Sequence, residues 1–149
     1  MKQRSKNIYW TVFLIYLGAL VWILFNRRRY TAGVPYLNQM LRHLNLRPFQ
    51  TIRLYLRLLL RPIRPVHVKL ALYNLLGNLF LFCPMGVLLP VLFPKFRSFS
   101  KTIVFVLAIV ISAEILQVLL LAGSCDVDDV ILNLLGAGLG YGLYKLLNL

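Results

Sequence analysis

Four long apolar stretches, separated by shorter basic segments, run through this chain of 149 residues. A helix that crosses the hydrocarbon core of a bilayer needs about 20 mostly apolar residues. The four stretches have about that length, and the only charged residues inside them are Glu114 and Lys145. They cover residues 8–25, 70–93, 102–122 and 130–147. The pattern predicts an all-α membrane bundle of about four transmembrane helices, in one domain over residues 1–149.

The composition supports a membrane location. Hydrophobic residues make up 60% of the chain and its mean hydropathy is +0.75, which is more apolar than a soluble domain of this size requires. The basic N-terminus before the first apolar stretch resembles a secretory signal, but no small-residue cleavage pattern follows it. We therefore expect an uncleaved anchor and a multi-pass protein of the cell (cytoplasmic) membrane.

A net charge of +13 would suggest a nucleic-acid partner in a soluble protein. Here the arginines and lysines lie between the apolar stretches, where they meet the surface of a membrane. We therefore expect the partner to be the lipid bilayer, in particular anionic lipid or a lipid-linked cell-wall precursor, and no nucleic acid.

Charge around the last two apolar stretches predicts an orientation. Basic residues flank them at Lys95, Arg97, Lys101 and Lys145. The segment 123–129 between them carries only acids, so the positive-inside rule places it outside the cell and both termini in the cytoplasm. With four spans, the connection 26–69 and its ten basic residues also lie outside, against the rule. The length of the connection, or a re-entrant or spanning piece inside it, would resolve this conflict.

Within this connection, Arg53, Arg57 and Arg61 recur every fourth residue, with leucine and isoleucine between them. The spacing predicts a short amphipathic helix with a basic stripe, ended by Pro62 and Pro65. One interpretation is an interfacial helix on anionic head groups, where each basic residue contributes about 1 kcal/mol. The sharper interpretation is a site for one phosphorylated lipid.

All four acidic residues fall in the segment 114–129. Glu114 lies inside the third apolar stretch, where an ionised carboxylate costs about 2.5 to 3.5 kcal/mol, so it must be protonated, paired or in contact with water. Gln117 shares its helix face, and the two form either an interhelical clamp or part of a ligand site. The remaining three are Asp126, Asp128 and Asp129. One aspartate is enough to cap a helix, so three predict a basic partner from the connection, or a cation.

The second apolar stretch carries Asn74 and Asn78 one turn apart, ahead of Pro84. Pro84 cannot donate a backbone hydrogen bond and predicts a kink. The two asparagines either line a cavity or bond to Glu114 or Gln117 across the bundle. The candidate polar site as a whole comprises Asn74, Asn78, Glu114, Gln117, Asp126, Asp128, Asp129 and Asn133.

Glycines four residues apart in the fourth stretch allow another helix to approach closely. They form the pairs Gly136 with Gly140 and Gly138 with Gly142. The two cysteines and two histidines show no metal-ligand spacing, so we expect no metal site, and nothing in the sequence indicates a cofactor.

Four strings together resemble the VanZ-like family of bacterial integral membrane proteins. They are NLRPFQTI (45–52), NLLGNLFLFCPMG (74–86), SAEILQ (112–117) and CDVDDVILNLLG (125–136). The resemblance depends on the order of an asparagine-rich helix ending in F-x-P-x-G, a helix with E-x-x-Q, and a D-x-D-D-x-x-x-N hairpin. The family often has an arginine shortly before the acidic cluster, where this chain has Gly123 and Ser124.

The resemblance implies a cell-envelope protein linked to reduced susceptibility to glycopeptide antibiotics, notably teicoplanin, in Gram-positive bacteria. One hypothesis is a non-enzymatic protein that binds or shields a lipid-linked cell-wall component, with Arg53, Arg57 and Arg61 on its phosphate. Another is an enzyme acting on a phosphorylated isoprenoid or peptidoglycan lipid, with Glu114 or Asp128 as general acid or base and a metal on the aspartates. A third is a structural scaffold for a membrane partner. No nucleophile is evident, which favours a non-enzymatic function.

Overall fold

The computed structural model describes residues 3–26, 31–61 and 64–148. Its elements are α1 (Gln3–Phe25), α2 (Tyr36–Arg42), β1 (Leu44–Asn45), α3 (Gln50–Leu60), α4 (Pro65–Leu81), α5 (Cys83–Leu92), the 3₁₀ turn η1 (Pro94–Phe96), α6 (Phe99–Leu119), β2 (Cys125–Asp126) and α7 (Val127–Leu146). The predicted all-α helical bundle is confirmed. Pro62, expected to end the amphipathic helix, and the basic residues 27–29 lie outside the described residues.

Three helical segments among the described residues are long and apolar enough to cross a membrane. They are Lys6–Phe25, Pro65–Leu92 and Phe99–Leu119. The fourth predicted stretch forms α7, which is about 30 Å long at 1.5 Å per residue. It is less apolar because it carries two aspartates, an asparagine and four glycines. Since α7 packs against α4, α5 and α6, much of its surface faces protein rather than lipid. The count of four spans stays a prediction.

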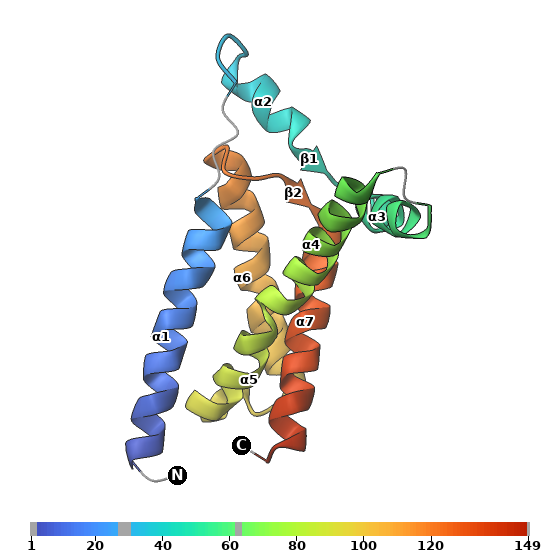
Figure 1. Cartoon of the computed structure of the whole chain (residues 1–149). Coiled ribbons are helices and arrows are strands. Elements are labelled where there is room, and N and C mark those ends of the chain that lie inside the picture. Colours follow the sequence, from blue (N-terminus) through green and yellow to red (C-terminus); the bar gives the residue numbers. More distant parts are fainter. Residues whose placement is uncertain (1–2, 27–30, 62–63, 149) are drawn as a thin grey trace.

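The long connection and the acidic hairpin lie at the same end of the bundle. Figure 1 shows α2, β1, β2 and α3 at this end and both termini at the other. At 7 and 11 residues, α2 and α3 are about 10 and 17 Å long, too short to cross a core of about 30 Å. The described part of the connection therefore contains no spanning piece of the kind that would have resolved the charge conflict.

A short parallel strand pair, which the sequence did not predict, joins the connection to the hairpin. Residue Leu44 is in register with Cys125, and Asn45 with Asp126. The amide of Cys125 also donates a hydrogen bond of 2.8 Å to the carbonyl of His43. These backbone bonds fix the connection beside the start of α7.

The second predicted span is interrupted at Phe82, between α4 and α5. Pro84 occupies the first turn of α5, where a missing N–H removes no intrahelical bond. The hydroxyl of Tyr16 on α1 donates a hydrogen bond of 2.9 Å to the carbonyl of Leu81 at the interruption. The expected kink is thus a break in the helix, and α1 satisfies one of the carbonyls next to it.

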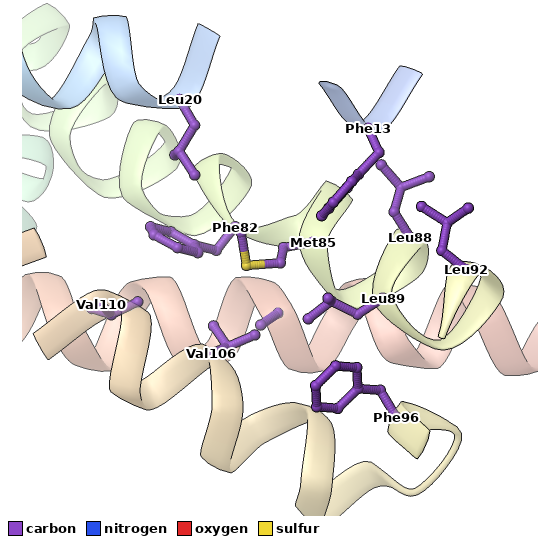
Figure 2. Packing of buried hydrophobic residues seen from close by; sticks show 11 residues of the cluster. Phe13, Leu20, Phe82, Met85, Leu88, Leu89, Leu92, Phe96, Val106 and Val110 are labelled. Carbon is purple, nitrogen blue, oxygen red and sulfur yellow. The ribbon is translucent and has the colours of Figure 1, made fainter. Parts of the chain in front are cut away.

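The apolar core is centred on α5. Phe82 at the break before α5 and Met85 and Leu89 within it are almost completely buried. Side chains of α1 and α6, among them Phe13 and Val106, surround them, as Figure 2 shows. This core holds α1, which is otherwise largely exposed, against the rest of the bundle.

The first predicted glycine pair lies in direct backbone contact with α4 and α5. A Cβ atom added to Gly136 would lie 1.8 Å from the carbonyl oxygen of Leu79, and one added to Gly140 would lie 2.0 Å from that of Cys83. In return, a Cβ on Gly86 of α5 would lie 2.1 Å from a carbonyl oxygen of α7. Only glycine permits this approach, so the prediction for this pair is confirmed.

The second glycine pair makes no such contact. A Cβ on Gly138 would approach only a ring atom of Phe99, at 4.0 Å, and one on Gly142 would meet nothing within 4 Å. The predicted close approach is therefore wrong for this pair within the described part of the chain.

We expect Gly136→Ala to destabilise the protein by about 2 kcal/mol or more, because the added methyl group must displace the backbone of α4. The matched change Gly142→Ala should be neutral or slightly stabilising, because its methyl group enters open space and alanine favours a helix. Thermal unfolding of both purified variants in detergent measures the difference. Equal midpoints for the two variants would contradict the proposed backbone contact.

Candidate functional site

The helix α3 has no capping side chain of its own. Its first residue follows Phe49, whose φ of 63° is in the left-handed region and whose apolar side chain cannot accept a hydrogen bond. The first N–H groups of a helix have no partner inside the helix, and they carry the positive end of its dipole. They therefore need an acceptor from elsewhere in the molecule.

Asp128 of α7 provides this acceptor. Its Oδ2 atom accepts hydrogen bonds from the backbone N–H groups of Thr51, at 2.7 Å, and Ile52, at 2.9 Å, while Oδ1 accepts one from the N–H of Phe49. The side chain is fully buried. One carboxylate thus binds the start of α3 through three backbone donors, which is more than the usual capping of its own helix.

Asp126, the last residue of β2, joins the same network two residues before Asp128. Its Oδ1 atom accepts from the N–H of Asp128 at 2.9 Å and so caps α7. Its Oδ2 atom accepts from the amide of Asn45 at 3.0 Å and from the hydroxyl of Thr51. The predicted capping role belongs to Asp126, and the same side chain ties α7 to the connection.

Glu114 reaches the network from α6. It is buried, and its Oε2 atom accepts a hydrogen bond of 3.0 Å from the backbone N–H of Asp126. Gln117 instead donates to the carbonyl of Leu24 on α1, at 3.0 Å. The two residues that share a face of α6 therefore bind different segments, and they do not form one clamp.

The two asparagines of α4 also have different hydrogen-bond partners. Asn78 donates a hydrogen bond to Asp129 of α7, while Asn74 donates to Leu70 of its own helix at 2.8 Å. The expected bonds of these asparagines to Glu114 or Gln117 are not formed among the described residues, so that expectation is wrong. The structure leaves Asn74 outside the network of Asp126 and Asp128.

Asn133 lies one turn below Asp129 on α7. Only 3% of its surface is exposed, and its Oδ1 atom has no hydrogen-bond partner among the described residues. Side chains of a helix point back toward its N-terminus, so Asn133 is directed toward the level of Asp129. It extends the polar stripe of α7 by one turn further along the helix.

Within the described ranges, the arginines of α3 do not pair with Asp126 or Asp128. Arg53 and Arg57 lie on the exposed face of α3, and Arg61 is exposed directly after it. The donors that reach Asp126 and Asp128 in the described parts of the chain are backbone N–H groups, an amide and a hydroxyl. The predicted arginine partner for these two aspartates is therefore wrong, because the start of α3 and its preceding loop provide the donors.

The thiol of Cys125 lies at the edge of the acidic network. Burial raises its pKa above the ordinary value, and the nearby carboxylates of Glu114, Asp126 and Asp129 raise it further. A negative thiolate is unfavourable there because it would stand close to other negative groups. Over the described ranges, no group of three or more His, Cys, Asp or Glu side chains is arranged to hold a metal ion.

The sequence interpretation missed the donors of the network. Asn45 and Thr51 lie in the string NLRPFQTI, and neither was a candidate site residue. No sequence signal marked them, because Thr51 stands directly before Ile52 and has the residue type of an N-cap for the predicted helix. Only the structure shows that α3 begins at Gln50 and has no capping side chain of its own.

Comparisons with known proteins agree on one family. The model of the VanZ/LLP1 family matches residues 13–148. Protein VanZ of Enterococcus faecium is 30% identical over 134 residues, which are 90% of this chain and 71% of that relative. No solved structure matches this chain. The family match includes α3 and the whole acidic network.

We expect Asp128→Asn to release the start of α3. The neutral amide accepts more weakly and has one oxygen for three donors, and each lost hydrogen bond to a charged group costs about 1.5 to 3 kcal/mol. Hydrogen exchange at the amides of Phe49, Thr51 and Ile52 should therefore accelerate by about tenfold to a hundredfold. The control is Asn74→Ala, which removes only a bond within α4. Unchanged protection in Asp128→Asn would contradict the capping role.

Proposed function

Because this chain belongs to the VanZ/LLP1 family, we propose that it is a cell-envelope membrane protein that binds or shields a lipid-linked cell-wall component. The single observation that carries the proposal is the exposed basic face of α3, which the acidic network holds beside the bundle. Arginine suits this function because its planar group binds phosphate oxygens through paired hydrogen bonds. From the family we also infer lowered susceptibility to glycopeptides such as teicoplanin.

The charge of α3 supports a phosphate partner. Arg53 and Arg57 are one helical turn apart, so two guanidinium groups face the same side. Exposed leucines flank them: Leu54, Leu56 and Leu60 are 54%, 47% and 81% exposed. Leucine beside arginine suits the boundary between lipid tails and head groups. A phosphorylated lipid offers both kinds of contact at once.

Burial of the acids supports binding rather than catalysis. A general base must come within hydrogen-bond reach of the proton that it removes. Asp128 is fully buried with three backbone donors on its oxygens, and Glu114 is only 5% exposed. Both carboxylates hold segments of the chain together, which is a positioning role.

For the orientation, we propose that both termini lie in the cytoplasm and that the acidic hairpin and α3 lie outside. The support is the charge of the hairpin, which carries acids and no basic residue over 123–129. The connection shares the end of the bundle with the hairpin. In this orientation α3 meets the outer leaflet, where a glycopeptide would act.

Single cysteines at the two ends of the bundle test this orientation. Native Cys125 is a poor reporter because it is partly buried and its pKa is raised. In a background without native cysteines, we expect an impermeant maleimide on intact cells to label Arg47→Cys. The matched variant Lys95→Cys, equally exposed at the other end, should react only after permeabilisation. The reverse pattern would place α3 in the cytoplasm.

Susceptibility of a sensitive Gram-positive host tests the function. Each arginine contributes about 1 kcal/mol at an anionic surface, so Arg53→Gln/Arg57→Gln should bind its lipid about 30-fold more weakly. We expect the wild type to raise the inhibitory concentration of teicoplanin and this double variant to lose the effect. Vancomycin is measured in parallel.

The control variant for this experiment removes two positive charges at the opposite end, as Arg97→Gln/Lys101→Gln. Both side chains are exposed, so the control should behave as the wild type. Membrane levels of all variants are compared by immunoblot. Identical teicoplanin values with and without the wild type, at equal membrane levels, would contradict the proposed function.

A further inference from the structure

A pocket of about 490 Å³ lies beside β1, which Figure 1 shows between α2 and α3. Small-molecule sites commonly have volumes of about 300 to 1,000 Å³. Four successive residues of the connection and one residue of the first turn of α3 line the pocket: Leu44, Asn45, Leu46, Arg47 and Gln50. Within the described part of the chain, no residue of β2 or α7 contributes to this lining. The pocket therefore lies on the side of β1 that faces away from β2.

The lining also indicates that the pocket follows the edge of β1 rather than one of its faces. Successive side chains of a strand point to opposite faces, so a pocket on one face is lined by every second residue. Here Leu44 and Asn45 both line the pocket, together with the two residues that follow them. The sheet has only two strands among the described residues, so the outer edge of β1 has no neighbouring strand. Backbone groups at this edge are therefore accessible from the pocket.

Two backbone groups of β1 point to this outer edge. The carbonyl of His43 accepts a hydrogen bond from Cys125 and so points toward β2. Because the peptide groups of an extended strand alternate in direction, the carbonyl of Leu44 and the N–H of Leu46 point away from β2. Neither group bonds to another backbone group among the described residues. The edge thus presents one acceptor and one donor to a ligand.

The charge of the pocket restricts the ligand further. Arg47 is exposed, and the lining contains no acid. A guanidinium group binds a carboxylate or a phosphate through paired hydrogen bonds. A phosphate ester has no N–H donor for the carbonyl of Leu44, whereas a peptide group has both a donor and an acceptor. The strand edge and Arg47 together therefore favour a peptide that carries a carboxylate.

Resting on the proposed function, we infer that this pocket binds the peptide part of the lipid-linked cell-wall component, as an extended segment added to the outer edge of β1. The segment runs parallel to β1, so that one of its residues donates to the carbonyl of Leu44 and accepts from the N–H of Leu46. Its C-terminal carboxylate then lies beside Arg47. The side chains of Leu44 and Leu46 are 41% and 63% exposed and provide apolar contacts.

Charge also argues against a second copy of this chain as the added strand. The connection 26–69 carries ten basic residues and no acid. Pairing β1 of two copies would bring like charges together, which is unfavourable. A segment with a free carboxylate has the complementary charge.

The test measures binding of tritiated N-acetyl-trialanine to the full chain in phosphatidylcholine nanodiscs by equilibrium dialysis. We expect Arg47→Gln to weaken binding about tenfold or more, because a charge-assisted bond to the carboxylate is lost. The matched control is Arg42→Gln, which removes the same charge from an exposed residue of α2 that does not line the pocket. This control should bind as the wild type does, and thermal midpoints of both variants verify folding.

Unlabelled analogues test the strand pairing without any change in the protein. A methyl group on the nitrogen of the second alanine removes the donor for the carbonyl of Leu44, so this analogue should compete about threefold to tenfold more weakly. In the proposed register the nitrogen of the third alanine points away from β1, so a methyl group there should have little effect. The C-terminal amide of the peptide should also compete weakly, because it places a neutral group at Arg47.

Other results overturn the inference. Equal weakening by Arg42→Gln and Arg47→Gln reduces the binding to general attraction by a basic surface. Equal competition by the two N-methyl analogues excludes strand pairing, and inorganic phosphate that competes as strongly as the peptide makes the pocket a simple anion site. Absence of binding to the wild type rejects the peptide ligand. In that case the proposed function still stands if the wild type raises the inhibitory concentration of teicoplanin and Arg53→Gln/Arg57→Gln abolishes this effect.

Discussion

The arrangement at the end of the bundle that carries α3 depends on the carboxylate of Asp128. It is buried, and it binds three backbone N–H groups that lie 76 to 79 residues earlier in the sequence. An ionised group in a low-dielectric environment is costly unless charge-assisted hydrogen bonds and a helix dipole compensate it. The start of α3 provides both, and α3 in turn has no capping side chain of its own. Each partner resolves the unsatisfied polar groups of the other, which explains why a short helix from a long connection is held against α7.

The position of Asp128 depends in turn on how closely α7 approaches α4 and α5. Gly136 and Gly140 place the backbones in contact, so no side chain sets the spacing between these helices. Burial between other helices also explains the polar composition of α7, because a helix that faces protein does not need the apolar surface that lipid demands. The hydrogen bond from Asn78 to Asp129 lies along the same contact. Glycine packing and polar pairing therefore act on one interface, and they fix the start of α7 where it can cap α3.

Periodicity and composition were sufficient to predict the helices, because a membrane leaves few ways to satisfy the hydrogen bonds of a backbone. The apolar stretches, the break near Pro84, the basic helix around Arg53 and the contacts of Gly136 and Gly140 all follow from local patterns. The partners of the acids could not be predicted from local patterns, since charge alone favoured arginine as the partner of Asp126 and Asp128. In the structure, backbone donors and Asn45 and Thr51 occupy those positions. Which donor reaches a carboxylate depends on the three-dimensional path of the connection, and no spacing in the sequence encodes the pairing of β1 with β2.

Because Asp126 and Asp128 bind neutral donors rather than arginines, the net charge of +13 has a different consequence for the surface of the protein. Had Asp126 and Asp128 paired with Arg53 and Arg57, the charge of these two arginines would be compensated locally. Instead Asp126 and Asp128 are enclosed with neutral donors, and Arg53 and Arg57 stay exposed beside leucines. A field of this kind is strongest next to a low-dielectric bilayer and attracts anions to its boundary. Asp126 and Asp128 thus anchor the helix that carries the basic surface through backbone and neutral side-chain donors rather than through its arginines. We propose an anionic lipid as the partner, because its head group suits the arginines and its hydrocarbon chain suits the adjacent leucines.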